Sequence, residues 1–132
     1  MEEKYSYHIS LHLSFKKDVD VDELERHFGI EAHKKISFLD SKGPHKAAKI
    51  WYRSKESTNV NTDQAIESFT RHIFEYFGDL KEVLANNNGK ATFSLIFTKT
   101  NERPIIGLTP ATISMFEKLG VAFDVDFMDT FN

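Results

Sequence analysis

The chain has 132 residues, of which 40% are hydrophobic, and it contains twelve Phe, no Cys and a net charge of −3. This length and composition are typical of one domain with one hydrophobic core, so we treat residues 1–132 as a single domain. The lack of Cys excludes disulfides, thiolate zinc sites, iron–sulfur clusters and cysteine nucleophiles.

The first predicted element is a strand over residues 5–15. Apolar and polar side chains alternate throughout it, which predicts one buried face and one polar face that carries His8 and His12. Asp20 is the predicted N-cap of a helix over residues 21–28, which Gly29 would end.

Two further strands are expected, a short one near residues 35–39 and a second near residues 48–54. We predict that Trp51, the single tryptophan, lies in the centre of the second strand and anchors the core. A polar loop then leads to a second helix, capped by Asn61 or Thr62. Its apolar positions follow helical spacing, at Ile66, Phe69, Ile73, Phe74 and Phe77.

Leu80–Ala85 is predicted as a short helical continuation, and Asn88-Gly89 as part of a turn in which Asn-Gly adopts positive φ. An alternating strand follows over residues 91–98. Thr109 and Pro110 suit the N-cap and first position of a third helix. Its predicted core side chains are Ile113, Phe116 and Leu119, and a last alternating strand follows over residues 121–127.

These elements predict an α+β fold with one mixed sheet of about five strands. Several strands have one apolar and one polar face, so helices are expected mainly on one side of the sheet. The order of elements resembles a split βαβ arrangement.

The chain resembles an uncharacterised bacterial family, domain of unknown function 4279, over nearly its whole length. The resemblance rests on the first strand, on the helix start at residues 20–24, on Ile50-Trp51-Tyr52 and on the ending at residues 119–127. It implies no established activity. Some small bacterial domains of this kind resemble immunity proteins of toxin systems, which implies a protein partner.

Two groups of residues are candidates for a binding role. The first is a basic segment from His33 to Arg53 with six Lys or Arg against one acid. Its candidate ligand-binding residues are Lys34, Lys35, Lys46, Lys49, Trp51 and Arg53. Aromatic rings beside cations suit nucleic acid or nucleotides. The second is a polar strand face, whose candidate partner-binding residues are His8, His12, Asp124 and Asp126.

Catalysis and metal binding are poorly supported. His8 and His12 lie four residues apart on a strand, about 13 Å, which is too far to chelate one ion. The acids at positions 18, 20 and 22 lack the Gly and Glu that a calcium loop requires. No phosphate loop, HExxH motif or nucleophile elbow occurs. We therefore expect no metal, no cofactor and no catalytic residue.

The sequence thus favours a non-catalytic protein-binding domain, and a nucleic-acid or nucleotide-binding module is the alternative. The first residues contain no apolar signal-peptide core, and no apolar run approaches the ~18 residues of a membrane helix. We therefore expect a cytoplasmic protein that does not bind membranes.

Overall fold

The structure is a computed structural model, and it describes residues 5–100 and 104–128. Its elements follow in the order β1 (Tyr5–Phe15), α1 (Val21–Phe28), β2 (Lys34–Ile36), β3 (Ala48–Arg53), α2 (Thr62–Phe74), a 3₁₀ helix η1 (Glu75–Phe77), α3 (Leu80–Asn86), β4 (Gly89–Thr100), α4 (Pro110–Leu119) and β5 (Ala122–Phe127). Within the described ranges, no helix is long and apolar enough to cross a membrane.

The five strands form one mixed sheet in the order β2-β3-β1-β4-β5. β1 lies in the centre and pairs antiparallel with both β3 and β4, whereas β4 and β5 are parallel. β3 and β4 therefore run in the same direction on either side of β1, and α2 and α3 connect them. This is a split βαβ unit, and the predicted α+β fold is confirmed.

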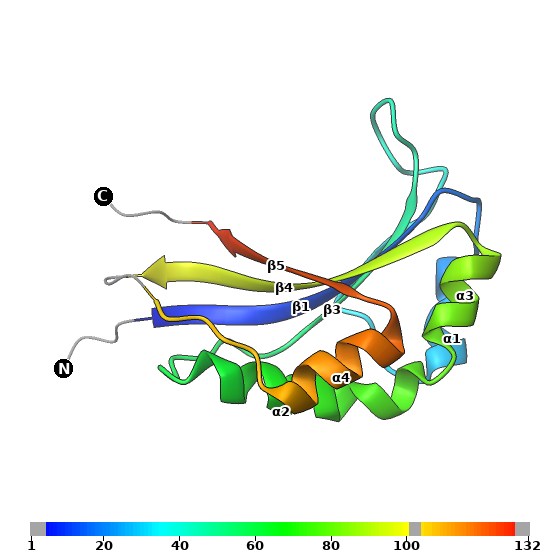
Figure 1. Ribbon diagram of the computed structural model, residues 1–132. Coiled ribbons are helices and arrows are strands. Elements are labelled where there is room, and N and C mark those ends of the chain that lie inside the picture. Colours follow the sequence, from blue (N-terminus) through cyan, green and yellow to red (C-terminus); the bar gives the residue numbers. More distant parts are fainter. Residues whose placement is uncertain (1–4, 101–103, 129–132) are drawn as a thin grey trace.

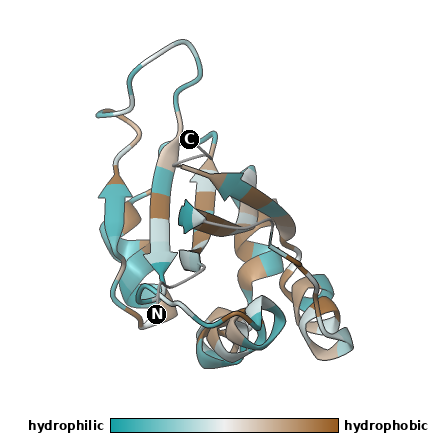
Figure 2. Ribbon diagram, turned by 90° about the vertical axis from the view of Figure 1, so that its left-hand side faces the viewer, coloured by the Kyte–Doolittle hydropathy of each residue, from teal (hydrophilic) through white to brown (hydrophobic). Residues whose placement is uncertain are grey.

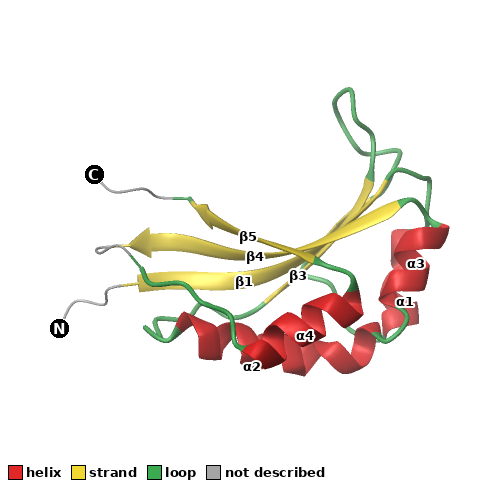
Figure 3. Ribbon diagram, in the orientation of Figure 1, coloured by secondary structure: helices red, strands yellow, loops and turns green. Residues whose placement is uncertain are grey.

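The helices lie on one face of the sheet, and the opposite face is open (Figures 1 and 3). Hydropathy alternates along the strands, as the bands of Figure 2 show, because successive side chains point to opposite faces. The apolar side chains pack against the helices. Aromatic pairs such as Tyr52–Phe77 and Phe93–Phe116, with ring centroids 5.1 Å and 4.7 Å apart, connect sheet and helices. Each fully buried Phe contributes roughly 1.5–3 kcal/mol to folding.

The predicted ends of α1 and the predicted start of α4 are confirmed, whereas Asn61 precedes α2 without making a side-chain cap bond and α2 ends at Phe74. The Asp20 carboxylate accepts hydrogen bonds from the N–H groups of Asp22 and Glu23 at 3.1 Å and 3.2 Å. Gly29 ends α1 in the left-handed conformation, at φ 76°. At α4, the Thr109 hydroxyl accepts a bond from the N–H of Thr112 at 3.1 Å. These caps satisfy backbone groups that a helix leaves without partners, so short local sequences fix these helix ends.

The prediction that Trp51 anchors the core is wrong. In the register of β3 with β1, Ile50 pairs with Leu13 and Tyr52 pairs with Leu11, and all four side chains are buried. Trp51 lies between two inward-facing residues and must therefore point to the open face. Tyr52 occupies the core position instead.

Two local predictions also need correction. Ile113 is 52% exposed, because the buried face of α4 is formed by Thr112, Met115, Phe116 and Leu119. The small Thr112 faces inward, next to the capping Thr109, and this rotates Ile113 toward solvent. In the turn before β4, Asn88 adopts the positive φ, of 52°, while Gly89 is already a strand residue paired with Phe15.

Candidate functional site: the open face of the sheet

The open face is formed by the alternate strand residues that point away from the helices. The strand registers place these residues on it: Lys34 and Ile36 of β2, Lys49, Trp51 and Arg53 of β3, Ser6, His8, Ser10, His12 and Ser14 of β1, Lys90, Thr92, Ser94, Ile96 and Thr98 of β4, and Ala122, Asp124 and Asp126 of β5. Both groups of residues singled out in the sequence contribute to it. The basic residues and the polar strand face therefore belong largely to one surface.

A row of three side chains from neighbouring strands crosses the centre of the open face. Trp51 pairs with His12 of β1 on one side and with Lys34 of β2 on the other. The His12 ring stacks on the indole with centroids 4.7 Å apart and planes 7° from parallel. The Lys34 ammonium lies 5.3 Å from the indole centroid, within the range of a cation–π contact. Neighbouring side chains on both sides therefore already contact the indole.

A second cluster surrounds Glu56, which follows β3. One of its carboxylate oxygens, Oε1, accepts hydrogen bonds from the hydroxyls of Ser6, at 2.6 Å, and of Thr98. The other oxygen, Oε2, lies 3.4 Å from Nδ1 of His8. Burial alone would raise the pKa of Glu56, but the hydroxyl donors and His8 outweigh burial and lower it. Glu56 is therefore held as a carboxylate beside β1.

Sequence reasoning missed this cluster. Glu56 lies in a stretch that reads as a polar loop, and its partners Ser6 and Thr98 are 50 and 42 residues away. No spacing rule connects residues so distant. The one available signal was that Ser6 belongs to the polar face of the first strand, which predicted a polar neighbour without identifying it.

Burial favours the neutral form of the two histidines of the open face. Burial lowers the pKa of His8, and the nearby positive charge of Arg53 lowers it further. Burial also lowers the pKa of His12, with a smaller contribution from Lys49 that Asp124 opposes. Nδ1 of His8 is buried against the Glu56 carboxylate, 3.4 Å away. Nε2 of His12 is buried and makes no hydrogen bond with described residues, and such an unpaired polar atom is costly.

Charge is divided across the open face. Lys34, Lys49 and Arg53 lie on β2 and β3, whereas Asp124 and Asp126 lie on β5 at the opposite margin. Between them, β1 and β4 contribute mainly uncharged Ser and Thr side chains, with the exposed Lys90 of β4 as a further cation. This layout suits a partner whose own charges are divided in the opposite sense.

Two of the predicted residues lie elsewhere. Lys35 points to the helix side of the sheet, where its ammonium contacts Asp22 and Glu25 of α1 at 2.5 Å and 2.8 Å. Lys46 is exposed in the connection between β2 and β3, which projects beyond the sheet (Figure 1). The basic segment is therefore split, because period-two alternation sends Lys34 and Lys35 to opposite faces.

The open face offers little for metal or acid–base chemistry. No group of three His, Asp or Glu side chains able to hold a metal ion occurs among residues 5–100 and 104–128. The Glu56–His8 contact is a carboxylate beside an imidazole, but no nucleophile is hydrogen-bonded to that imidazole in the described part of the chain. The arrangement can bind a partner by hydrogen bonds and charge.

Comparison with known proteins gives one result. Residues 4–130 match the sequence model of a family described as Domain of unknown function (DUF4279). No curated protein and no solved structure matches the chain significantly. Because the match covers nearly the whole chain, the protein belongs to the DUF4279 family.

Proposed function

We propose that this domain binds another protein through the open face of its sheet. The observation that carries the proposal is a helix-free sheet face with a basic margin on β2 and β3 and an acidic margin on β5. Separated charges of both signs favour a folded protein partner over a uniformly charged polymer. The resemblance of some small bacterial domains to immunity proteins favours a toxin as that partner.

The alternative, binding of nucleic acid or a nucleotide, has weaker support. Base stacking needs a free aromatic face, but His12 and Lys34 contact the Trp51 ring from both neighbouring strands. Asp124 and Asp126 would also repel phosphates at the far margin of the same surface. A fluorescent single-stranded oligonucleotide that binds the wild type tightly at physiological salt would favour this alternative.

The test reverses charge at one margin at a time. We expect Lys34→Glu with Lys49→Glu, and separately Asp124→Lys with Asp126→Lys, to weaken binding of the partner protein recovered from cell extract. A matched control is Lys118→Glu, an exposed position on α4 on the other side of the sheet. Circular dichroism and thermal melts check that each variant folds, since exposed substitutions usually change stability by about 0.5 kcal/mol or less.

Two outcomes would contradict the proposal. Either both double variants bind the partner as tightly as the wild type, or Lys118→Glu weakens binding as much as they do. Hydrogen exchange with and without the partner gives an independent check, because protection should appear in β1, β3 and β4 and not in α4. A toxin gene next to the gene for this protein would give the first candidate partner, and growth rescue on co-expression would test it.

A further inference from the structure

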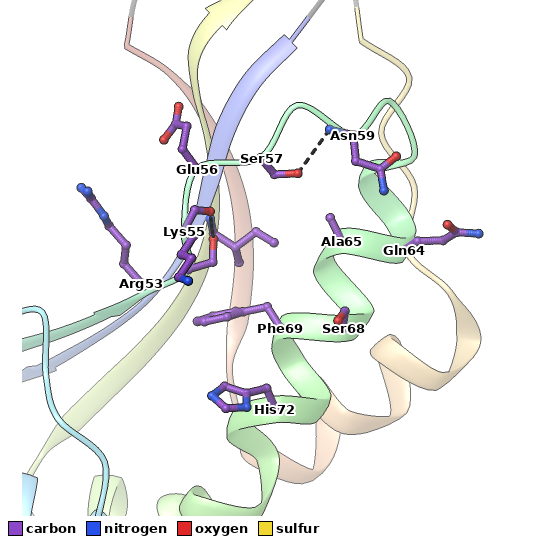
Figure 4. Close-up of a pocket in the computed structure, with 12 residues that line it drawn as sticks. Arg53, Lys55, Glu56, Ser57, Asn59, Gln64, Ala65, Ser68, Phe69 and His72 are labelled. Atoms are coloured by element: carbon purple, nitrogen blue, oxygen red, sulfur yellow. Dashed lines mark hydrogen bonds between the residues drawn. The ribbon is translucent and has the colours of Figure 1, made fainter.

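A groove of about 710 Å³ lies between helix α2 and residues 53–57 (Figure 4). Arg53 is the last residue of β3, and the other four follow it. The groove lies at the margin of the sheet and borders the open face at Arg53 and Glu56. Its walls come from residues 53–59 on one side and from one side of α2 on the other. The groove therefore runs along the segment that follows β3, beside a helix.

Beyond β3, residues 54–57 stay beside β1 with one extra residue. The N–H of Ser54 donates to the carbonyl of Ile9 at 2.8 Å, and Ser57 pairs with Tyr7. Both Lys55 and Glu56 therefore lie opposite His8. The N–H of Ser57 donates to the carbonyl of Tyr7 at 2.7 Å, and the N–H of Tyr7 donates back to Ser57 at 3.0 Å. In an antiparallel pair, the neighbour of such a doubly bonded residue directs its own N–H and C=O away from the partner strand. Glu56 therefore presents its backbone groups to the outer edge.

That outer edge has no strand beside it in the described structure. β2 is three residues long and pairs with β3 through Lys49–Trp51. Beyond it, the N–H of His33 donates to the carbonyl of Trp51 at 2.7 Å. The N–H groups of Lys55 and Glu56 make no backbone hydrogen bond to residues 5–100 or 104–128. Unpaired groups at a sheet edge are the feature to which an extended segment adds as a strand.

The side chains of the groove define what would fit. Ala65, Phe69 and His72 follow one side of α2 at helical spacing, and Phe69 and His72 project toward residues 53–57 (Figure 4). Phe69 is partly exposed and supplies an apolar surface, while its ring edge rests on Phe93, with centroids 6.1 Å apart.

A cation stands at the rim of the groove. Lys55 is exposed there, whereas the side chain of Arg53, which belongs to the open face, points away from α2 (Figure 4). The nearest carboxylate, that of Glu56, also points away from α2 and is bound by Ser6 and Thr98 (Figure 4). A segment lying in the groove would therefore meet the Lys55 ammonium at the rim and an apolar surface beneath.

We propose that this groove binds an extended acidic segment of a partner protein, which adds as a strand to the outer edge at Lys55 and Glu56. Residues 53–57 span about 16 Å when extended, so the groove takes roughly five residues of the segment. An acidic side chain of the segment lies near Lys55, and an apolar one covers Phe69. The groove borders the open face at Arg53 and Glu56, but Lys55 and the α2 residues that would hold the segment lie outside that face, so the proposal does not depend on the proposed function.

The experiment uses the full chain and a labelled peptide of alternating Glu or Asp and Val, with fluorescence anisotropy as the readout. The matched control peptide carries Lys in place of each acid. We expect the acidic peptide to bind at least tenfold more tightly than the basic one. Two further peptides carry N-methyl groups at every second residue, one at the odd positions and one at the even positions. Only one of the two patterns should abolish binding, because strand addition uses the N–H groups along one edge of the peptide.

Protein variants locate the bound peptide. Lys55→Glu and, separately, Ser68→Glu on α2 should each weaken acidic-peptide binding about tenfold or more, whereas Lys34→Glu with Lys49→Glu should not. Two exposed positions are used so that one misfolded variant does not decide the result. Equal binding of both peptides, unchanged affinity in Lys55→Glu and Ser68→Glu, or an equal loss in the Lys34 and Lys49 variant would each overturn the proposal.

Discussion

Substitution of Gly89 by Ala tests how closely β1, α3 and β4 pack. A Cβ atom at Gly89 would lie 2.6 Å from Cδ1 and 2.7 Å from Cε1 of Phe15, and 3.0 Å from Cδ2 of Leu84. Carbon atoms pack at about 3.5–4.0 Å, so the Phe15 ring must move by about 1 Å. Phe15 is fully buried, so its ring can move only by displacing the side chains packed around it.

Such overpacking costs about 1–3 kcal/mol. For a chain of 132 residues, this corresponds to a fall in Tm of about 4–11 °C, measured by circular dichroism or calorimetry. The matched control is Gly78→Ala, where a Cβ meets nothing within 4 Å and the backbone is helical, at φ −58°. We expect the control to keep or raise Tm slightly, because Ala restricts the unfolded chain. Gly89→Ala with the Tm of the wild type would refute the packing argument.

Two other predictions concern a helix cap and the histidines. Asp20→Ala removes the acceptor of two backbone N–H groups and should lower the free energy of unfolding by about 0.5–2 kcal/mol in urea titration, with exposed Asp18→Ala as the control. The pKa values of His8 and His12 are lowered in the folded state, so the unfolded chain binds more protons as pH falls below about 6.5, and stability should decrease there. Because protonated imidazole quenches stacked indole, Trp51 fluorescence should fall with a midpoint below 6.5, and His12→Gln should remove that step. A midpoint at or above 6.5 would contradict the burial of His12.

Short-range chemistry explains why so much of the secondary structure could be predicted. The alternation in residues 5–15 has one structural solution, a strand with one buried face, and the polar caps of α1 and α4 act within three residues of their helices. The sequence by itself therefore determined the elements, the one-sided sheet and the polar character of its open face. It did not reveal that Ile113 is exposed. Helical spacing allows either Thr112 or Ile113 to face the core, and in the structure the small Thr112 does so.

The tertiary structure alone decided which residues meet. His12, Trp51 and Lys34 come from three strands, and their contact depends on the strand order and register, which are set by pairing between distant segments. Glu56 reaches the open face through partners 42 and 50 residues away. The basic segment and the polar strand face looked like separate surfaces in the sequence. Cross-strand pairing joined them into one surface and sent Lys35 to the opposite side of the sheet, because side chains of adjacent strand residues point in opposite directions.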